Sequence, residues 1–152
     1  VQPVGTCVYI VENEMVFSYL MEQMQGKNVS LLCTSGQPRY AALKLISLIV
    51  QSGIPIYYSG DLDPDGIGIA DRLWQRFGNR IQFFGMSPED YRNSLSKEVF
   101  GENGRKKLEH IWHPLLRETA ELVRKTGKAG YQENTLKELS EKLVGCDQNQ
   151  NL

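Results

Sequence analysis

The sequence lacks the features that mark membrane, secreted and strongly charged proteins. None of its apolar runs reaches the roughly 18 residues that cross a bilayer, and no signal peptide is visible. The formal net charge of −1 leaves no overall basic field, so any binding of nucleic acid must use local patches. These absences predict a cytoplasmic protein without a membrane partner.

Cysteine is also scarce, and its count is odd. Two of the three, Cys7 and Cys33, lie in apolar runs, and Cys146 lies near the end of the chain. This usage predicts reduced, buried thiols of an intracellular protein and excludes a disulfide framework.

The sequence lacks repeats, low-complexity tracts and long linkers. Its 152 residues, 41% of them hydrophobic, suffice for one domain that buries about two-thirds of its unfolded surface. We expect residues 1–145 to form this domain and residues 146–152 to be a frayed tail. Because the chain begins at Val1 without Met, we also expect it to be a C-terminal piece of a longer protein.

Strand-like runs alternate with helical periodicity in the first half of the chain. The expected strands are 7–11, 29–33, 54–58 and 81–84, and the expected helices are about 14–25, 39–51 and 66–77. This alternation predicts an α/β fold with a mostly parallel four-stranded sheet flanked by helices.

After Phe84 no further strand is readable, and the sequence predicts a helical C-terminal extension. Ser87 and Pro88 fit the start of a short helix. An apolar stripe over 108–123 predicts a longer helix, which Pro114 should kink or divide. Thr135 and Glu138 fit a capping box for a last helix. Five aromatic residues are expected in the core, namely Tyr57, Trp74, Phe83, Phe84 and Trp112.

Three carboxylates, Asp61, Asp63 and Asp65, follow the third predicted strand at alternate positions. A calcium loop of the EF-hand type shares this spacing, but it needs a Glu where Arg72 stands and a helix where this chain has a strand. The acids therefore sit at a strand-to-helix corner, where α/β proteins place their chemistry. A capped turn with solvated acids is the alternative, and Asp65 also suits the N-cap of the following helix.

The first predicted strand ends in an acid as well, Glu12. If strands one and three are near each other in the sheet, Glu12 joins Asp61 and Asp63 in an all-oxygen site suited to Mg²⁺ or Mn²⁺. Such a site supports phosphoryl chemistry.

These motifs resemble a Toprim domain, in which a Glu ends the first strand and a D-x-D ends a later one. The string Gly60-Asp-Leu-Asp-Pro-Asp-Gly66 is similar to that of the topoisomerase VI A subunit. Together with Cys33-Thr-Ser-Gly-Gln-Pro38 and Ile67-Gly-Ile-Ala-Asp-Arg72, it resembles the Toprim-like C-terminal domain of the nuclease subunit of Wadjet plasmid-defence systems. The match spans about residues 7 to 85.

The resemblance implies metal-dependent cleavage of double-stranded DNA, with Glu12 as general acid/base or metal ligand and Asp61 and Asp63 as Mg²⁺ or Mn²⁺ ligands. Asp65 is an additional candidate ligand, and Glu133 matches a C-terminal acidic element of the group. The resemblance further implies an upstream DNA-binding domain and a condensin-like complex as partners, and it leaves room for a homodimer.

Three other functions remain open. A topoisomerase-like enzyme would need a Tyr from a separate domain, whereas a nuclease that activates water would not. A non-catalytic assembly or DNA-binding module would not need Glu12, Asp61 and Asp63 together. A phosphatase of the haloacid-dehalogenase type places its D-x-D on the first strand, which here carries Glu12 instead. The sequence does not distinguish DNA from RNA as substrate.

Three further groups of residues are weaker candidates for binding. Ser35, Gln37 and Arg39 precede the second predicted helix, where they form either a phosphate-binding loop or a structural turn. His110 and His113 have a possible zinc spacing but lack further ligands nearby. Several cations off the apolar stripe form either a solvated face or a track for DNA, namely Arg105, Lys106, Lys107, Arg117, Arg124, Lys125 and Lys128.

Overall fold

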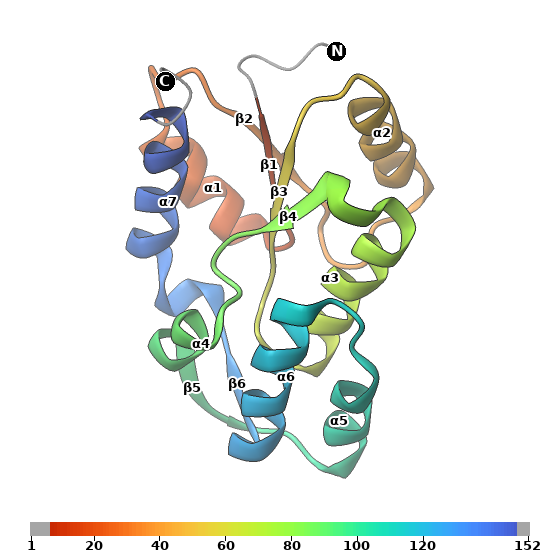
Figure 1. Cartoon of the computed structure of the whole chain (residues 1–152). Coiled ribbons are helices and arrows are strands. Elements are labelled where there is room, and N and C mark those ends of the chain that lie inside the picture. Colours follow the sequence, from red (N-terminus) through yellow and green to blue (C-terminus); the bar gives the residue numbers. More distant parts are fainter. Residues whose placement is uncertain (1–6, 149–152) are drawn as a thin grey trace.

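The computed structural model describes residues 7–148 and contains the predicted parallel sheet (Figure 1). Its strands are β1 (Val8–Val11), β2 (Ser30–Cys33), β3 (Ile56–Ser59) and β4 (Ile81–Phe83), in the spatial order β2-β1-β3-β4. All three pairings are parallel. The strand runs predicted from the sequence are therefore confirmed to within two residues at each end.

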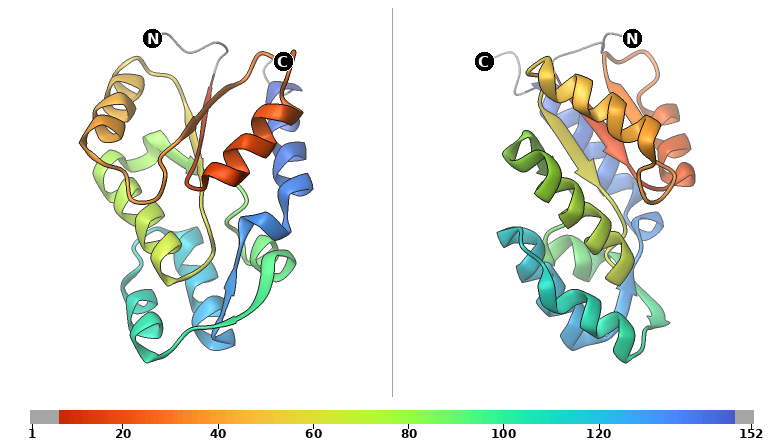
Figure 2. Two further views of the ribbon diagram at one scale, coloured as in Figure 1. Left: turned by 180° about the vertical axis from the view of Figure 1, so that it is seen from behind. Right: turned by 90° about the vertical axis from the view of Figure 1, so that its right-hand side faces the viewer.

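Helices cover both faces of this sheet. The helices are α1 (Glu14–Gln23), α2 (Tyr40–Gln51), α3 (Pro64–Phe77), α4 (Pro88–Ser94), α5 (Glu102–Lys107), α6 (Pro114–Thr126) and α7 (Leu136–Gln148). Figure 2 shows α2 and α3 on one side of the sheet and α1 and α7 on the other. This is the α/β architecture that the alternating pattern predicts.

The central strand β1 explains why the core has two halves. Val8 and Ile10 pack with α2 and α3, whereas Tyr9 and Val11 pack with α1 and α7. All four side chains are buried, because successive residues of a strand face opposite sides and both sides are covered. Burial on both faces fixes the register of β1, and with it the position of the residue that follows.

The prediction that no strand follows Phe84 is wrong. Strands β5 (Leu95–Val99) and β6 (Lys128–Gly130) form an antiparallel ribbon, and a bridge between Leu62 and Gly130 ties this ribbon to the end of β3. Most of β5 is exposed, so it lacks the apolar alternation that reveals a half-buried strand. The ribbon lies with α4, α5 and α6 beyond the carboxyl ends of the sheet (Figure 1).

Pro114 divides the predicted long helix, as expected. It occupies the first position of α6, where its missing N–H costs nothing, and the 3₁₀ turn Leu108–His110 ends the preceding helix. The prediction that Trp112 is a core residue is wrong: it lies in the connection before α6 and 66% of it is exposed. Helix α7 continues to Gln148, and residues 149–152 of the expected frayed tail lie outside the described residues.

Two further expectations concern the chain as a whole. Within residues 7–148, no helix combines the length and the apolar character needed to cross a membrane. Cys7 is buried and Cys33 is half-buried, while the side chain of Cys146 lies outside the described part of the chain.

Candidate functional site

The register of the sheet brings two strand ends together. Val11 pairs with Ser59, and the Glu12 N–H donates to Ser59 O at 3.3 Å. Glu12 and the segment from Gly60 to Asp61 therefore emerge side by side from the carboxyl edge. The condition under which the sequence places Glu12 near Asp61 and Asp63, that strands one and three are near each other, is met.

Two glycines of the acidic motif are needed for close approach. A Cβ at Gly60 would lie 2.9 Å from Glu12 Oε2, and a Cβ at Gly66 would lie 2.2 Å from the Asp61 carbonyl oxygen. The contact at Gly66 is with backbone and leaves no room for a side chain, so glycine is required there. At Gly60 the close atom is the end of the Glu12 side chain, so a larger residue would displace this carboxylate.

Each Asp of the motif has a separate partner. Asp61 Oδ1 accepts the backbone N–H of Gln132 at 2.8 Å, and Asp63 Oδ1 accepts that of Gly66 at 2.6 Å. Asp65, which was an alternative N-cap, instead forms an exposed salt bridge with Lys107 at 2.7 Å. Asp63 is the N-cap of α3, because Pro64 occupies the first position of the helix.

The carboxylates at this edge are electrostatically coupled. Burial, followed by repulsion from Asp61, raises the pKa of Glu12 to about 7. Burial also raises the pKa of Asp61 to about 6, and the negative charges of Asp63 and Glu133 add to this effect. The pKa of Asp63 is raised mainly by burial. Desolvated acids that repel one another disfavour their charged forms unless a cation is present.

Behind Glu12 lie three buried side-chain oxygens that make no hydrogen bond of good geometry, namely Glu12 Oε2, Thr34 Oγ1 and Tyr58 Oη. The Asp61 N–H is near enough to the Glu12 carboxylate, and the Thr34 hydroxyl near enough to the Tyr58 phenol, to lower the pKa of each group. Tyr58 Oη and Glu12 Oε2 lie 3.6 Å and 2.9 Å from the same point, the position of a Cβ at Gly60. Burial raises the pKa of the Tyr58 phenol, and the charge of Glu12 raises it further. The sequence analysis missed Thr34 and Tyr58, since a Tyr within an apolar strand gives no sign of a polar role.

A second part of the site comes from the end of β6. Gln132 is buried, and its Nε2 donates to Ser59 Oγ at 2.8 Å, so it is joined to the end of β3 as well as to Asp61. The next residue, Glu133, lies close enough to Asp61 to raise its pKa, as its assignment to the site requires. The Tyr131 hydroxyl donates to Glu98 Oε2 at 2.5 Å, and the charge of Glu98 contributes to the raised pKa of Asp63.

The loop predicted to bind phosphate lies against Glu12. The Gly36 N–H donates to Glu12 O at 3.2 Å, and Ser35, with a φ of 52°, donates through its hydroxyl to Glu14 Oε1 at 2.6 Å. Gln37 Oε1 accepts from Arg72 Nη2 at 2.7 Å. Arg39 is exposed at the start of α2 and its side chain does not cap the helix. The side chains of Ser35 and Gln37 are therefore engaged within the loop and its surroundings.

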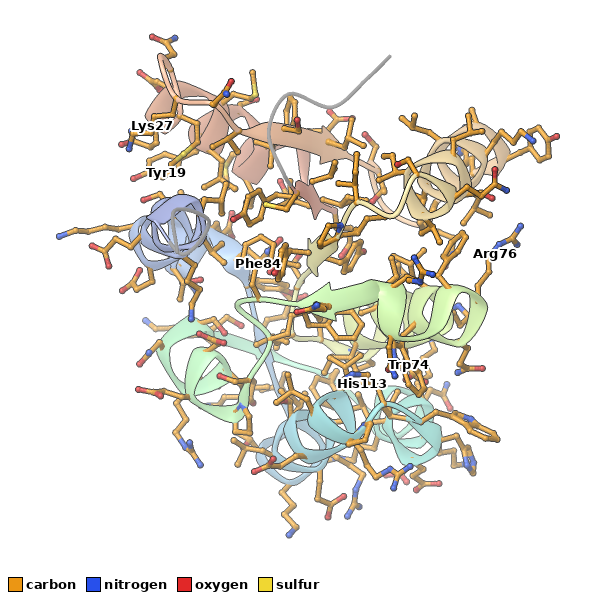
Figure 3. The ribbon with its side chains drawn as sticks, turned by 45° about the horizontal axis from the view of Figure 1, so that its top comes forward. Tyr19, Lys27, Trp74, Arg76, Phe84 and His113 are labelled. Atoms are coloured by element: carbon orange, nitrogen blue, oxygen red, sulfur yellow. The ribbon has the colours of Figure 1, made fainter. Side chains whose placement is uncertain are left out.

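His113, the second histidine of the spacing considered for zinc, has a structural role. His113 caps α6, with Nδ1 accepting the Leu116 N–H at 3.4 Å, and its ring packs edge-on against Trp74 and Phe83 (Figure 3). Burial lowers the pKa of His113. His113 is therefore a helix cap and a packing residue.

We call the carboxyl end of the sheet with Glu12, Asp61 and Asp63 the acidic edge; its geometry and its charge differ in how well they fit a cation. Within residues 7–148, no three His, Cys, Asp or Glu side chains are arranged so as to hold a metal ion together. The reason is that Asp61, Asp63 and Asp65 each turn toward a partner of their own. The unpaired oxygen of Glu12 and the raised pKa values nevertheless fit a hard divalent cation, which would offset the repulsion. The metal assignment stays a prediction.

Comparison with known proteins gives a distant relative and a family. The chain is 25% identical over 124 residues to the Wadjet protein JetD of Bacillus cereus (strain Q1). That alignment covers 73% of this chain but only 30% of the relative, so the chain corresponds to a part of it. The family described as "Protein of unknown function C-terminus (DUF2399)" matches residues 1–143, and the chain therefore belongs to this family.

Proposed function

We propose that the chain is a Toprim-type domain that hydrolyses the phosphodiester backbone of double-stranded DNA with Mg²⁺ or Mn²⁺. The observation that supports this proposal best is the placement of Glu12 beside Asp61 at the carboxyl edge, with Oε2 of Glu12 buried and unpaired. A module used only for assembly has no need for a desolvated acid of this kind.

Asp61 and Asp63 would hold the cation together with Glu12, and Asp65 would join them after leaving Lys107. The cation would supply neutralisation of phosphate charge and activation of water. Glu12 is the residue that would accept the proton of the attacking water, because its carboxylate lies at the end of β1 and its pKa of about 7 suits a proton acceptor near neutral pH. Tight packing of Gly60 against this carboxylate keeps its position fixed.

The setting of this activity is part of the proposal. Similarity to the Wadjet protein JetD supports a subunit of a defence complex. We propose an upstream DNA-binding region outside this chain and a condensin-like complex as partner, as the resemblance to the Wadjet nuclease subunit implies.

The test is cleavage of supercoiled plasmid by the full-length protein with its partners, with Mg²⁺ or Mn²⁺ and with a chelator. Glu12→Gln should lower the rate by about 10² or more, since it removes the proton acceptor while nearly preserving shape. Glu22→Gln, on the exposed side of α1, is the matched control and should cleave at the wild-type rate.

A second candidate, a non-catalytic DNA-binding or assembly module, is favoured by one observation: the described acids are not gathered around a common point. Cleavage at the wild-type rate by folded Glu12→Gln protein would make this the better assignment.

A further inference from the structure

Charge is distributed unevenly in the first half of the chain. No Asp or Glu occurs between Glu22 and Asp61, although this stretch includes all of β2, α2 and β3. On α3, the charged residues that follow the buried Asp71 are both cations, Arg72 and Arg76. The side of the molecule formed by α2 and the second half of α3 therefore has positive charge and no exposed acid.

A groove runs between these two helices, which lie next to each other in Figure 2. Its volume is about 200 Å³, and its lining combines apolar residues with Gln37, Arg72 and Arg76. Figure 3 shows the Arg76 side chain projecting outward from α3, and its guanidinium lies 5.6 Å from the ring centre of Phe77. We call this feature, together with the exposed Arg39 that follows its lining residue Pro38, the α2–α3 groove.

The cations of this groove lack acidic partners. Among the described residues, neither Arg39, Arg72 nor Arg76 forms a salt bridge. Arg72 instead donates to the neutral Gln37. Tyr40, next to Arg39, is 83% exposed, so an aromatic ring accompanies the positive charge.

The other basic face of the molecule differs in this respect. Lys107 pairs with Asp65, and both Arg124 and Lys125 pair with Glu121. Arg117 donates to two backbone carbonyls at the start of α6. Three cations of this face, which is an alternative track for DNA in the sequence analysis, therefore have acidic partners, whereas none of Arg39, Arg72 and Arg76 has one.

The groove also adjoins the acidic edge. The loop between β2 and α2 donates from Thr34 and Gly36 to the backbone of Val11 and Glu12, and its next residue, Gln37, holds Arg72. A ligand lying in the groove would therefore approach the carboxylates across a few residues of one loop.

We propose that the α2–α3 groove binds the sugar–phosphate backbone of duplex DNA next to the bond that is cut, with Arg39, Arg72 and Arg76 contacting phosphates. This inference rests on the proposed function and extends it to the path of the substrate. Arg suits this role because its planar, permanently charged group binds phosphate oxygens in pairs. The proposal further predicts that Gln37 orients Arg72 without contacting a base, so that binding depends little on the DNA sequence.

Binding can be measured without cleavage, by fluorescence anisotropy of a labelled duplex in the presence of a chelator. The double variant Arg72→Glu/Arg76→Glu should weaken binding by more than about tenfold. The milder Arg72→Ala/Arg76→Ala should lower the slope of log affinity against log salt by about 2. Arg92→Glu/Lys137→Glu, which makes the same charge change on the exposed sides of α4 and α7, should stay near wild type.

Equal weakening by the groove pair and the control pair would overturn the proposal, since it would show a bulk-charge effect. Preferential binding of polyglutamate over the duplex would also overturn it and indicate an acidic protein partner. The result is separable from cleavage: loss of binding in the groove variants, combined with wild-type cleavage by Glu12→Gln, would retain the groove and refute the proposed catalytic role.

Discussion

At the scale of single residues, the ionised carboxylates of Glu12 and Asp61 lower the stability of the fold. Glu12 and Asp61 have pKa values of about 7 and about 6, both above their ordinary values. A raised carboxyl pKa means that the folded protein binds protons more tightly than the unfolded chain. The stabilisation from these protons is complete below about pH 4 and is lost as the pH rises through 6 to 7.

The first prediction follows from this loss of stability with rising pH. In the absence of metal, Glu12→Gln should raise the free energy of unfolding at pH 8 by about 1 to 2 kcal/mol, because it removes a repelled and desolvated charge; the figure allows for partial solvent screening. At pH 4 the difference should vanish. Chemical denaturation measures the free energy of unfolding at both pH values. The control variant Glu22→Gln should leave it unchanged at pH 8 and at pH 4. A variant less stable than wild type at pH 8 would contradict the assignment of Glu12 as a strained acid.

The second prediction concerns Gly60. In Gly60→Ala the new methyl group would meet Glu12 Oε2 and the Tyr58 ring, so we expect a loss of about 1 to 3 kcal/mol in unfolding free energy and displacement of the carboxylate. Cleavage should fall with it. Gly101→Ala is the matched control, since its Cβ meets nothing within 4 Å and its φ of −87° suits any residue. Wild-type cleavage by Gly60→Ala would show that the position of Glu12 is unimportant.

At the scale of elements, the sequence predicts those helices and strands that have a clear hydrophobic pattern or clear capping residues at their ends. Strands β1 to β4 are apolar runs that end at turns, and α3 has an N-cap Asp, a first-position Pro and a terminal Gly. The ribbon of β5 and β6 has neither, because β6 is three residues long and β5 is exposed. Pairing across about thirty residues of chain, and not local propensity, makes these segments strands.

The candidate site likewise contains residues that the local sequence predicts and residues that depend on distant contacts. The placement of Glu12 beside the segment from Gly60 to Asp61 was predictable, since residues that follow two neighbouring parallel strands leave the sheet at the same edge. Tyr58 and Gln132 were not, because their contribution depends on contacts between distant parts of the chain. The bond from Gln132 to Asp61 joins residues 71 positions apart.

A third prediction concerns the connection between α3 and α6. Asp71 is buried and accepts the backbone N–H groups of Trp112 and His113 at 2.8 to 3.2 Å, as well as Gln75 Nε2 at 2.9 Å. Asp71→Ala would leave these donors unsatisfied, so we expect a loss of about 2 to 4 kcal/mol, measured by chemical denaturation. Asp71→Asn keeps an acceptor and should cost less. Equal losses in both variants would show that charge, not hydrogen bonding, holds the connection.

At the scale of the whole molecule, a net charge of −1 conceals two regions of opposite sign. Acids gather where the sheet meets the β5–β6 ribbon, and unpaired cations lie in the α2–α3 groove. A polyanion that enters the groove would be repelled by the acidic edge unless cations neutralise that edge. Under the proposed function, this arrangement would make productive approach of DNA depend on a bound metal ion.

The fourth prediction tests this dependence on the folded protein as a whole. Mn²⁺ should stabilise the native state, because it offsets repulsion that the unfolded chain does not have. At about ten times its dissociation constant the gain is about 1.4 kcal/mol, or roughly 3 to 6 °C in melting temperature for a domain of this size. Calorimetric scans at pH 8 with and without Mn²⁺ measure the shift.

The variant that decides the matter is Asp61→Asn/Asp63→Ser, since Asn keeps an acceptor for the Gln132 N–H and Ser still caps α3. The fold should survive in this variant while the shift disappears. Glu102→Ala/Glu109→Ala removes the same charge from exposed positions around α5 and should retain the full shift. A shift of equal size in both double variants would mean that Mn²⁺ binds elsewhere, and the acidic edge would then be an interaction surface instead of a metal centre.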